Sequence, residues 1–367
     1  IIMNICILGD GLTSLSLAKN LINKKINVHI YQNKKTINSL SSRTIGISKN
    51  NLEFFEKEIN KLPEKIKWEI KKIEIYSEKL KRNKILNFED GDKNLFYMVK
   101  NDALYKFLYN ELSKNKFFNK VLIKEKNFYD KLLKNNNYDL IINCNQDNPI
   151  SKKYFIKKIN KDYKNLAYTT ILEHEKLQNN SAIQVFTNVG SIAFLPISNT
   201  KTSVVFSIDI KNKNYNDTEI LDLIKKHNPK FKIKKILGLS NFELNSSNLR
   251  NYYHKNILAF GDLLHRIHPL AGQGFNMIIR DIKDLSEIIQ DKIELGIQLD
   301  SVILEEFERK TKNSNFIFSN GVDFIYELFN LDKKIKNQNL SKVLKIFGKN
   351  KKLMNSIIKY ADSGLNI

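Results

Sequence analysis

The stretch GDLLHRIHPLAGQGFN, residues 261–276, concentrates residue types that could bind a ligand. It holds three glycines and a proline, in a chain of 367 residues with only 13 Gly and 5 Pro. It follows the apolar run NILAF (256–260), which we expect to form a buried strand. Asp262 should then lie at the carboxyl end of that strand, the edge where doubly wound sheets bind ligands. Gly272 and Gly274 should open a helix and offer backbone N–H groups to an anion or a polar ring edge.

A second glycine turn lies near the start of the chain, between the apolar run NICIL and a segment with helical spacing. This strand–turn–helix arrangement, with NVHIY as the next strand, is typical of a dinucleotide-binding unit. Gly9 would permit the turn, and Gly11 would let a pyrophosphate approach the helix start. Ser14 takes the place of the usual third glycine. Gln32 stands where an acid usually holds the ribose, so its amide could accept that hydrogen bond without a charge.

Other reactive residue types indicate no further site. His265 and His268 have a spacing that could share a metal, but no further ligand completes a set, so we predict none. Cys6 and Cys144 lie in apolar runs, which favours buried structural roles, no disulfide and a reducing compartment.

The net charge of +22 comes from Lys spread along the whole chain, with Asn and Ile also abundant. We interpret this as compositional bias and predict no nucleic-acid partner, because no Arg-rich or aromatic-interleaved module is present. No apolar run is long enough to span a bilayer, and the first residues lack the features of a signal peptide. We therefore expect a cytoplasmic protein.

The order of elements predicts an α/β fold with interleaved domains. A doubly wound, Rossmann-type domain would alternate with a mixed or antiparallel sheet domain, because segments such as KWEIKKIEIYS and KTSVVFSIDI alternate like strands. Helices are expected at roughly 272–290, 299–328 and 339–361. The predicted division is a nucleotide-binding domain of 1–65, 97–160 and 251–328, a substrate-binding sheet domain of 66–96 and 161–250, and a helical C-terminal segment of 329–367.

These residues together resemble the class A flavoprotein monooxygenases, which have the para-hydroxybenzoate hydroxylase fold. Within that class, the chain is most similar to the ubiquinone-biosynthesis hydroxylases. The stretch 256–285 resembles their second FAD motif, and SAIQVFTNVGSIAFLPIS resembles strands of their substrate domain. Arg43 in SSRTIGIS matches an arginine that lies near the FAD. The resemblance extends over nearly the whole chain from Met3.

The resemblance implies FAD as cofactor and NAD(P)H as reductant. Asp262 would contact the ribityl or pyrophosphate part of the FAD. Pro269 and Gly272 would position the flavin, and no side chain is assigned as acid or base. The residues expected to border the isoalloxazine ring are Pro269, Gly272, Gln273, Gly274, Phe275 and Asn276.

The chain also departs from the family pattern. Four positions carry a residue other than the one common in relatives: Ser14, Gln32, Asp102 and Ile278. At position 278 the common residue is a glycine. The Asp-Gly motif that follows the strand YDLIINC in relatives is replaced by NQDNPIS, where Asn145-Gln146 or Asp147-Asn148 could take its place.

The predicted activity is an FAD-dependent, NAD(P)H- and O₂-using hydroxylation of a polyprenylated phenol in ubiquinone biosynthesis. Two alternatives stay open: a flavin-dependent isoprenoid reductase of the same fold, and a non-catalytic lipid-binding or scaffold member of a quinone-synthesis complex. Expected partners are the prenylated phenol, other quinone-synthesis proteins and an anionic membrane surface. The basic, amphipathic segment 333–352 could lie peripherally on the inner face of the cytoplasmic membrane, or simply pack on the nucleotide-binding domain.

Overall fold

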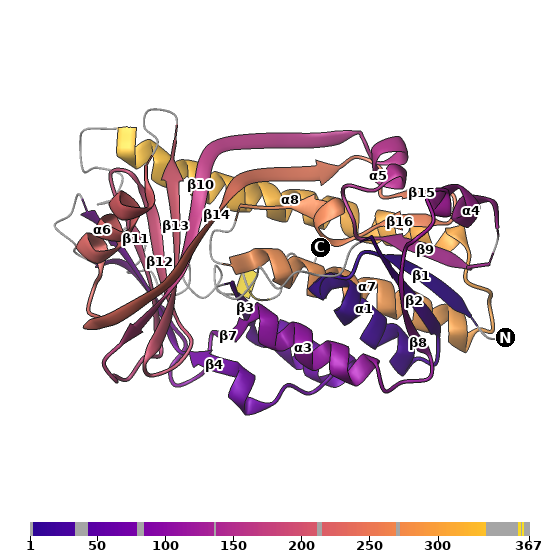
Figure 1. The fold of residues 1–367 in the computed structure, drawn as a ribbon, viewed down its shortest axis with the longest axis horizontal. Helices are drawn as coiled ribbons and strands as arrows, with labels where there is room; N and C mark the ends of the chain where they lie inside the picture. The colour runs from indigo at the N-terminus through magenta and orange to yellow at the C-terminus, as the bar shows by residue number, and fades with distance from the viewer. Residues whose placement is uncertain are drawn as a thin grey trace.

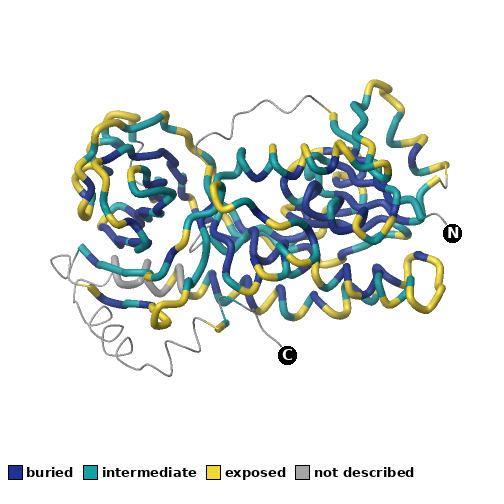
Figure 2. The backbone as a smooth tube through the Cα atoms, turned by 90° about the horizontal axis from the view of Figure 1, so that it is seen from below, coloured by how far each residue is buried: buried dark blue, intermediate teal, exposed yellow. Residues whose placement is uncertain are grey.

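The protein has two lobes, which are connected by two long strands and a long helix (Figure 1). The computed structural model describes residues 3–33, 43–78, 84–135, 137–210, 215–268, 272–334, 359–360 and 362. The connecting elements are β10 (Lys158–His174), β14 (Ile233–Leu249) and α8 (Ser301–Lys334). Each lobe has its own buried core (Figure 2).

The first lobe contains a six-stranded sheet in the order β15-β16-β9-β1-β2-β8. Neighbouring strands pair parallel, except β15 with β16. The central strands are buried along almost their whole length, because uninterrupted apolar runs suit strands covered on both faces. The strands are β1 (Asn4–Leu8), β2 (Asn27–Gln32), β8 (Phe118–Leu122), β9 (Leu140–Asn143), β15 (Tyr253–His254) and β16 (Ile257–Ala259). The predicted doubly wound domain is confirmed.

Three helices pack side by side in this lobe. α1 (Leu12–Asn23) contacts both α3 (Asn101–Leu112) and α7 (Gln273–Glu294), and α7 also contacts α8. The predicted helices at 272–290 and 299–328 correspond to α7 and α8, which extend further than expected. The helix predicted at 339–361 lies almost entirely outside the described residues. Within the described part of the chain, none of the helices combines the length and apolar character needed to cross a bilayer.

The second lobe contains an eight-stranded sheet in the order β17-β14-β10-β13-β12-β11-β5-β6. Neighbours pair antiparallel, except β11 with β5, so the predicted mixed sheet is confirmed. Helix α6 (Asp217–His227) covers its outer face through Ile220 and Ile224, which belong to the same core as Phe194 and Phe206. The remaining strands are β5 (Lys72–Ser77), β6 (Lys84–Glu89), β11 (Ser181–Phe186), β12 (Gly190–Pro196), β13 (Lys201–Asp209) and β17 (His265–Arg266).

The prediction of a single strand in KWEIKKIEIYS is wrong. β4 (Lys67–Ile70) pairs with β7 (Phe96–Lys100), which also pairs with β3 (Thr44–Ser48), in a separate three-stranded sheet. The chain then enters the large sheet as β5. The apolar alternation changes phase between Ile70 and Ile73, and Lys71 donates its N–H to the carbonyl of Asn180 at that point. The sequence therefore does signal that one strand ends and another begins here, because a single strand would keep its apolar residues at every second position.

The domain boundaries expected from sequence remain a proposal. The parallel sheet draws its strands from 1–65, 97–160 and 251–328, and most strands of the large sheet come from 66–96 and 161–250. β17 belongs by sequence to the first group, yet it pairs with β14 of the large sheet. The shorter helices are α2 (Lys49–Phe54), α4 (Phe128–Lys134) and α5 (Pro149–Tyr154).

Candidate functional site

The first glycine turn leaves the start of α1 open. Gly9 has a φ of +107°, a conformation that favours glycine, and its N–H donates to the carbonyl of Tyr31 at 2.8 Å. Gly11 is the N-cap of α1, without a capping side chain, and a Cβ added there would meet nothing within 4 Å. The first turn of α1 also contains no acidic residue. These N–H groups are thus oriented to receive an anion.

Two further predicted residues lie beside this turn. Ser14 is fully buried in the first turn of α1. Gln32 ends β2, and its side-chain oxygen is buried with no hydrogen-bond partner among the residues described. Because a buried acceptor normally has a donor, Gln32 is suited to receive a hydroxyl from a bound ribose.

Asp262 lies at the carboxyl edge of the parallel sheet, as predicted. It belongs to a 3₁₀ turn (Gly261–Leu263) that follows β16, and its side chain is exposed. Gly261 has a φ of +63°, and a Cβ there would stand 2.6 Å from Thr13 Cγ2. Only glycine therefore lets this turn approach the start of α1 so closely.

The segment that replaces the Asp-Gly motif is held by amide side chains. Asn145 lies next to the first turn, since a Cβ on Gly9 would be 3.5 Å from the Asn145 Cβ. Gln146 donates to the carbonyl oxygen of Asp262 and accepts from Arg266 at 3.1 Å. Asn148 instead caps α5 by accepting from Ser151 N at 2.8 Å. Of the two pairs that could replace the motif, Asn145-Gln146 is the one beside Gly9 and Asp262.

Cys144, between β9 and this segment, is not a reactive thiol. Burial raises the pKa of the Cys144 thiol to about 12, against the opposing effect of its hydrogen bond with Ser14. The thiol stays protonated at neutral pH, and the thiolate is the nucleophilic form. Cys6 is fully buried in β1, where burial also raises its pKa.

The second glycine turn starts α7. Gly272 is its N-cap, with a φ of +66°, and a Cβ there would lie 3.6 Å from the backbone N of Gly46 in β3. A Cβ on Gly274 would meet nothing within 4 Å, and the side-chain oxygen of Gln273 has no partner in the described part of the chain. The start of α7 thus presents open backbone and an available acceptor. Pro269 lies outside the described residues.

Asn276 and Phe275, also predicted to border the ligand, face inward. Asn276 is 1% exposed; its side chain accepts from Ser48 N at 2.9 Å and donates to the carbonyl of Gly46 at 3.0 Å. Phe275 is buried in the core of the first lobe. Both side chains position the start of α7 against β3, and any contact they make with a ligand would come from their backbone.

Arg43 marks the side of the large sheet that faces the first lobe. Its exposed guanidinium lies 4.8 Å from the ring centroid of Phe242 in β14. The neighbouring Thr44 donates to Ser203 Oγ of β13 at 2.9 Å. This face lies opposite α6, because its residues alternate with those packed under that helix. By the strand register this face carries large side chains, among them Ile171, Leu195 and Phe242, beside the smaller Ala167, Thr169, Ala193, Ser203, Val205 and Ser207.

His265 takes part in a buried polar group that sequence reasoning missed. Its Nε2 contacts the carboxylate of Asp281, whose other oxygen accepts from Asn315 Nδ2 at 2.9 Å. All three residues are buried. The acid in the apolar run MIIRDI was the available signal, because a buried carboxylate requires partners. No cluster of three or more metal-binding side chains occurs among the described residues.

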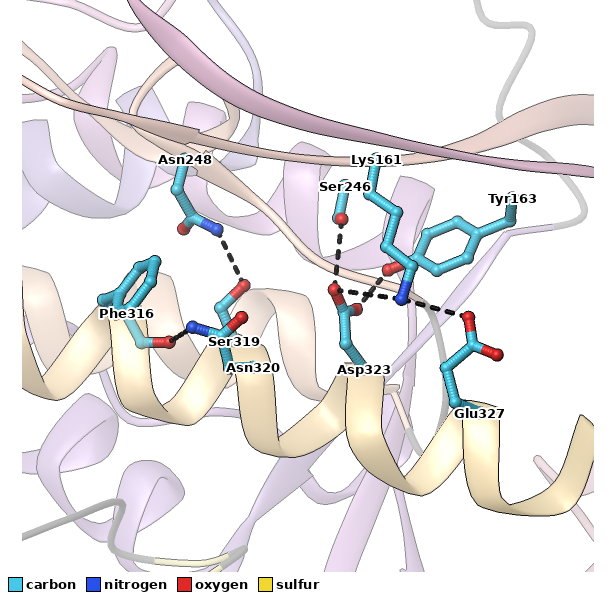
Figure 3. Close-up of polar contacts among 9 residues, drawn as sticks. All are labelled: Lys161, Tyr163, Ser246, Asn248, Phe316, Ser319, Asn320, Asp323 and Glu327. Carbon is cyan, nitrogen blue, oxygen red and sulfur yellow. Dashed lines mark hydrogen bonds and ion pairs between the residues drawn. The ribbon is translucent and has the colours of Figure 1, made fainter. Parts of the chain in front are cut away.

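A second missed group fixes α8 to the long strands (Figure 3). Asp323 of α8 accepts from Tyr163 of β10 and, at 3.5 Å, from Ser246 of β14. One turn earlier in α8, Ser319 accepts a hydrogen bond at 2.9 Å from Asn248, which lies two residues after Ser246 in β14. These contacts bind the helix to the strands that connect the two lobes.

Comparisons with known proteins show similarity in sequence and in fold. Residues 160–294 match the FAD binding domain family. The chain is 27% identical over 183 residues to the mitochondrial ubiquinone biosynthesis monooxygenase COQ6 of Dictyostelium discoideum, covering 40% of this chain and 37% of that protein. It is 30% identical over 155 residues to the 3-demethoxyubiquinol 3-hydroxylase of Escherichia coli, covering 41% and 40%. The chain thus spans about two fifths of these curated relatives.

Solved structures resemble the whole chain. The p-nitrophenol 4-monooxygenase PnpA of Pseudomonas putida gives a TM-score of 0.78 at 12% identity, covering 100% of this chain and 99% of that one. Klebsiella pneumoniae HpxO, solved with FAD and uric acid, gives 0.73 at 12% identity, covering 99% and 97%.

The fold is therefore that of the class A flavoprotein monooxygenases, as the sequence resemblance implied. Over about two fifths of its length, the chain is similar in sequence to ubiquinone-biosynthesis hydroxylases. The prediction of FAD as the cofactor is confirmed by the family match.

Proposed function

We propose that the protein is an FAD-dependent monooxygenase that uses NAD(P)H and O₂ to hydroxylate a polyprenylated phenol in ubiquinone biosynthesis. The observation that carries this proposal is the pair of open helix starts. Gly11 is the N-cap of α1 and Gly272 the N-cap of α7. Both helices lack a capping side chain, and both lie in the lobe that carries the sequence motifs. The names of the relatives support the reaction and the substrate class.

The described residues fit FAD. Gly9, Gly11 and Ser14 would receive the diphosphate at α1, and the unpaired oxygen of Gln32 would accept from the ribose. Asp262, at the sheet edge, would bind the ribityl or pyrophosphate part. The residues left for the ring are Arg43, Gly272, Gln273 and Gly274, with Phe275 and Asn276 supporting them.

Bound FAD, reduced by NAD(P)H, would supply the oxygen chemistry. The chain's own residues would bind the flavin, orient the substrate and shield both from water. The α7 N–H groups would bind the polar edge of the ring, and the side chain of Asn276 keeps the start of α7 fixed relative to β3. The aromatic substrate would bind between the large sheet and the first lobe, on the face opposite α6, and the enclosing sheet would limit access of water. No acid or base side chain is required from the site.

A membrane contact would supply the water-insoluble substrate. Phe316, Ile317 and Phe324 of α8 are 43%, 45% and 67% exposed, on a protein with a net charge of +22. We propose that the protein binds anionic bilayers peripherally, through this part of α8 and the predicted basic helix at 333–352, most of which lies outside the described residues. Co-sedimentation with anionic vesicles should weaken at high salt and when Lys342, Lys345, Lys349, Lys351 and Lys352 become Gln.

An absorbance spectrum of the purified protein, followed by oxygen and NAD(P)H consumption assays, tests the activity. A yellow protein that consumes both only with a phenol present agrees with the proposal. A product formed without O₂ would favour the isoprenoid reductase. A colourless protein that still binds a prenylated phenol would favour the scaffold.

A further inference from the structure

The first glycine turn carries a negative charge close to where an anionic cofactor would bind. Asp10 lies between Gly9, which makes the turn, and Gly11, whose Cβ position is open at the start of α1. A diphosphate bound there would be repelled by an uncompensated carboxylate on the same turn, because like charges in a partly buried site are weakly screened.

A lysine from a distant strand meets this carboxylate. Lys120 lies in β8, in register with Ile30 of β2, and its Nζ is 3.1 Å from Asp10 Oδ2. The two side chains are only 13% and 19% exposed. By contrast, the pair formed by Glu111 of α3 and Lys114, two residues beyond that helix, is 37% and 73% exposed. The Asp10–Lys120 pair is therefore shielded from solvent to an extent that surface pairs are not.

Two tyrosines of α3 hold the ammonium in place. Lys120 donates to the hydroxyl of Tyr105 at 3.0 Å, and its Nζ lies 5.7 Å and 4.8 Å from the ring centroids of Tyr105 and Tyr109. Burial acts to lower the pKa of Lys120, but the hydrogen bond to Tyr105 and the charge of Asp10 outweigh it, so this pKa is raised. Lys120 therefore carries its positive charge at neutral pH.

We infer that Lys120 is a positioning residue for the cofactor: it neutralises Asp10, so that the first glycine turn can accept the diphosphate. The inference rests on the proposed function, since it assumes a diphosphate at α1. It deepens that proposal by assigning roles to Asp10, Lys120, Tyr105 and Tyr109, and it explains how a turn with an acid between its glycines still serves as an anion site.

The test measures FAD dissociation constants of the full chain by flavin fluorescence, together with apoprotein unfolding by circular dichroism. Lys120→Met should weaken FAD binding at least about tenfold, equivalent to about 1.4 kcal/mol. Asp10→Asn should bind FAD at least as tightly as wild type, because it removes the repelling charge. The double variant should return to within about threefold of Asp10→Asn, since the two sites are coupled. Lys114→Met, which removes an equal charge from the surface, should leave binding unchanged.

Three results would overturn the inference alone. Lys120→Met could bind FAD like Lys114→Met, the double variant could bind as weakly as Lys120→Met, or Asp10→Asn could weaken binding. The second result would show that the lysine acts by packing. The third result, weaker FAD binding by Asp10→Asn, would overturn the inference even when Lys120→Met does not fold. Wild-type protein that takes up no FAD would overturn the proposed function as well, and all variants would then be colourless alike.

Discussion

Helix α1 and helix α7 both begin at a glycine, but different parts of the molecule hold the two starts in place. The start of α1 is shaped by backbone: Gly9 makes the turn, and Gly261 allows the turn after β16 to pack against Thr13. The start of α7 is held by side-chain hydrogen bonds, because Asn276 bonds to the backbone of both Gly46 and Ser48. We therefore expect a substitution at the start of α7 to lower the stability of the apoprotein, and a substitution at the start of α1 to weaken ligand binding.

The largest effect is expected from Asn276→Ala. It leaves a buried N–H and a buried carbonyl of β3 without partners, which should lower the free energy of unfolding by about 3 kcal/mol. The matched control is Asn23→Ala on α1, an exposed residue whose amide donates to the carbonyls of Glu58 at 3.0 Å and Ile59 at 2.9 Å. Chemical denaturation of both apoproteins measures the difference. Equal stability of the two variants would contradict the role given to Asn276.

Substitutions of two glycines near α1 should distinguish an effect on folding from an effect on ligand binding. Gly261→Ala should destabilise the apoprotein by about 2 kcal/mol, because the residue has a positive φ and the added Cβ meets Thr13. Gly11→Ala should change stability by about 0.5 kcal/mol or less, since nothing lies near the added Cβ. It should nevertheless weaken FAD binding about tenfold, because the methyl group blocks the approach of the diphosphate. Unchanged FAD affinity in Gly11→Ala would contradict the placement of the diphosphate at this turn.

Asp262→Ala tests the sheet edge between the two helices. Its carboxylate is exposed, so water competes for its hydrogen bonds, and we expect a loss of about 1 kcal/mol in FAD binding. Stability of the apoprotein should not change, because the contact with Gln146 uses the backbone of Asp262. FAD titration and a melting curve together distinguish this from a folding defect.

The smallest effect concerns the ribose. Gln32→Glu should tighten FAD binding by about two- to fivefold, because a carboxylate is a stronger acceptor than an amide. Isothermal titration would show the gain in affinity. Equal or weaker binding would place the ribose elsewhere.

The features that sequence predicted are those that depend on neighbouring residues. The apolar run and glycines around Gly9 predict a strand, a turn and a helix, and NILAF followed by Gly261 predicts a strand end carrying Asp262. Contacts between distant segments were not predictable. The bonds of Asn276 to β3 span 228 and 230 residues, and the bond of Lys120 to Asp10 spans 110. No local pattern encodes such partners, so the sequence identified the glycine turns but not the side chains that hold them.

The interleaving of the two lobes has a consequence for how the chain folds. β1, at residues 4–8, pairs with β9, which in turn pairs with β16 at residues 257–259. The large sheet likewise needs β14, which ends at residue 249, to cover one side of β10. Neither sheet can be completed on the ribosome before the segments up to Leu249 and Ala259 have been synthesised. Because such long-range pairings must close large loops, we expect slow folding in which both lobes acquire their stability late and together.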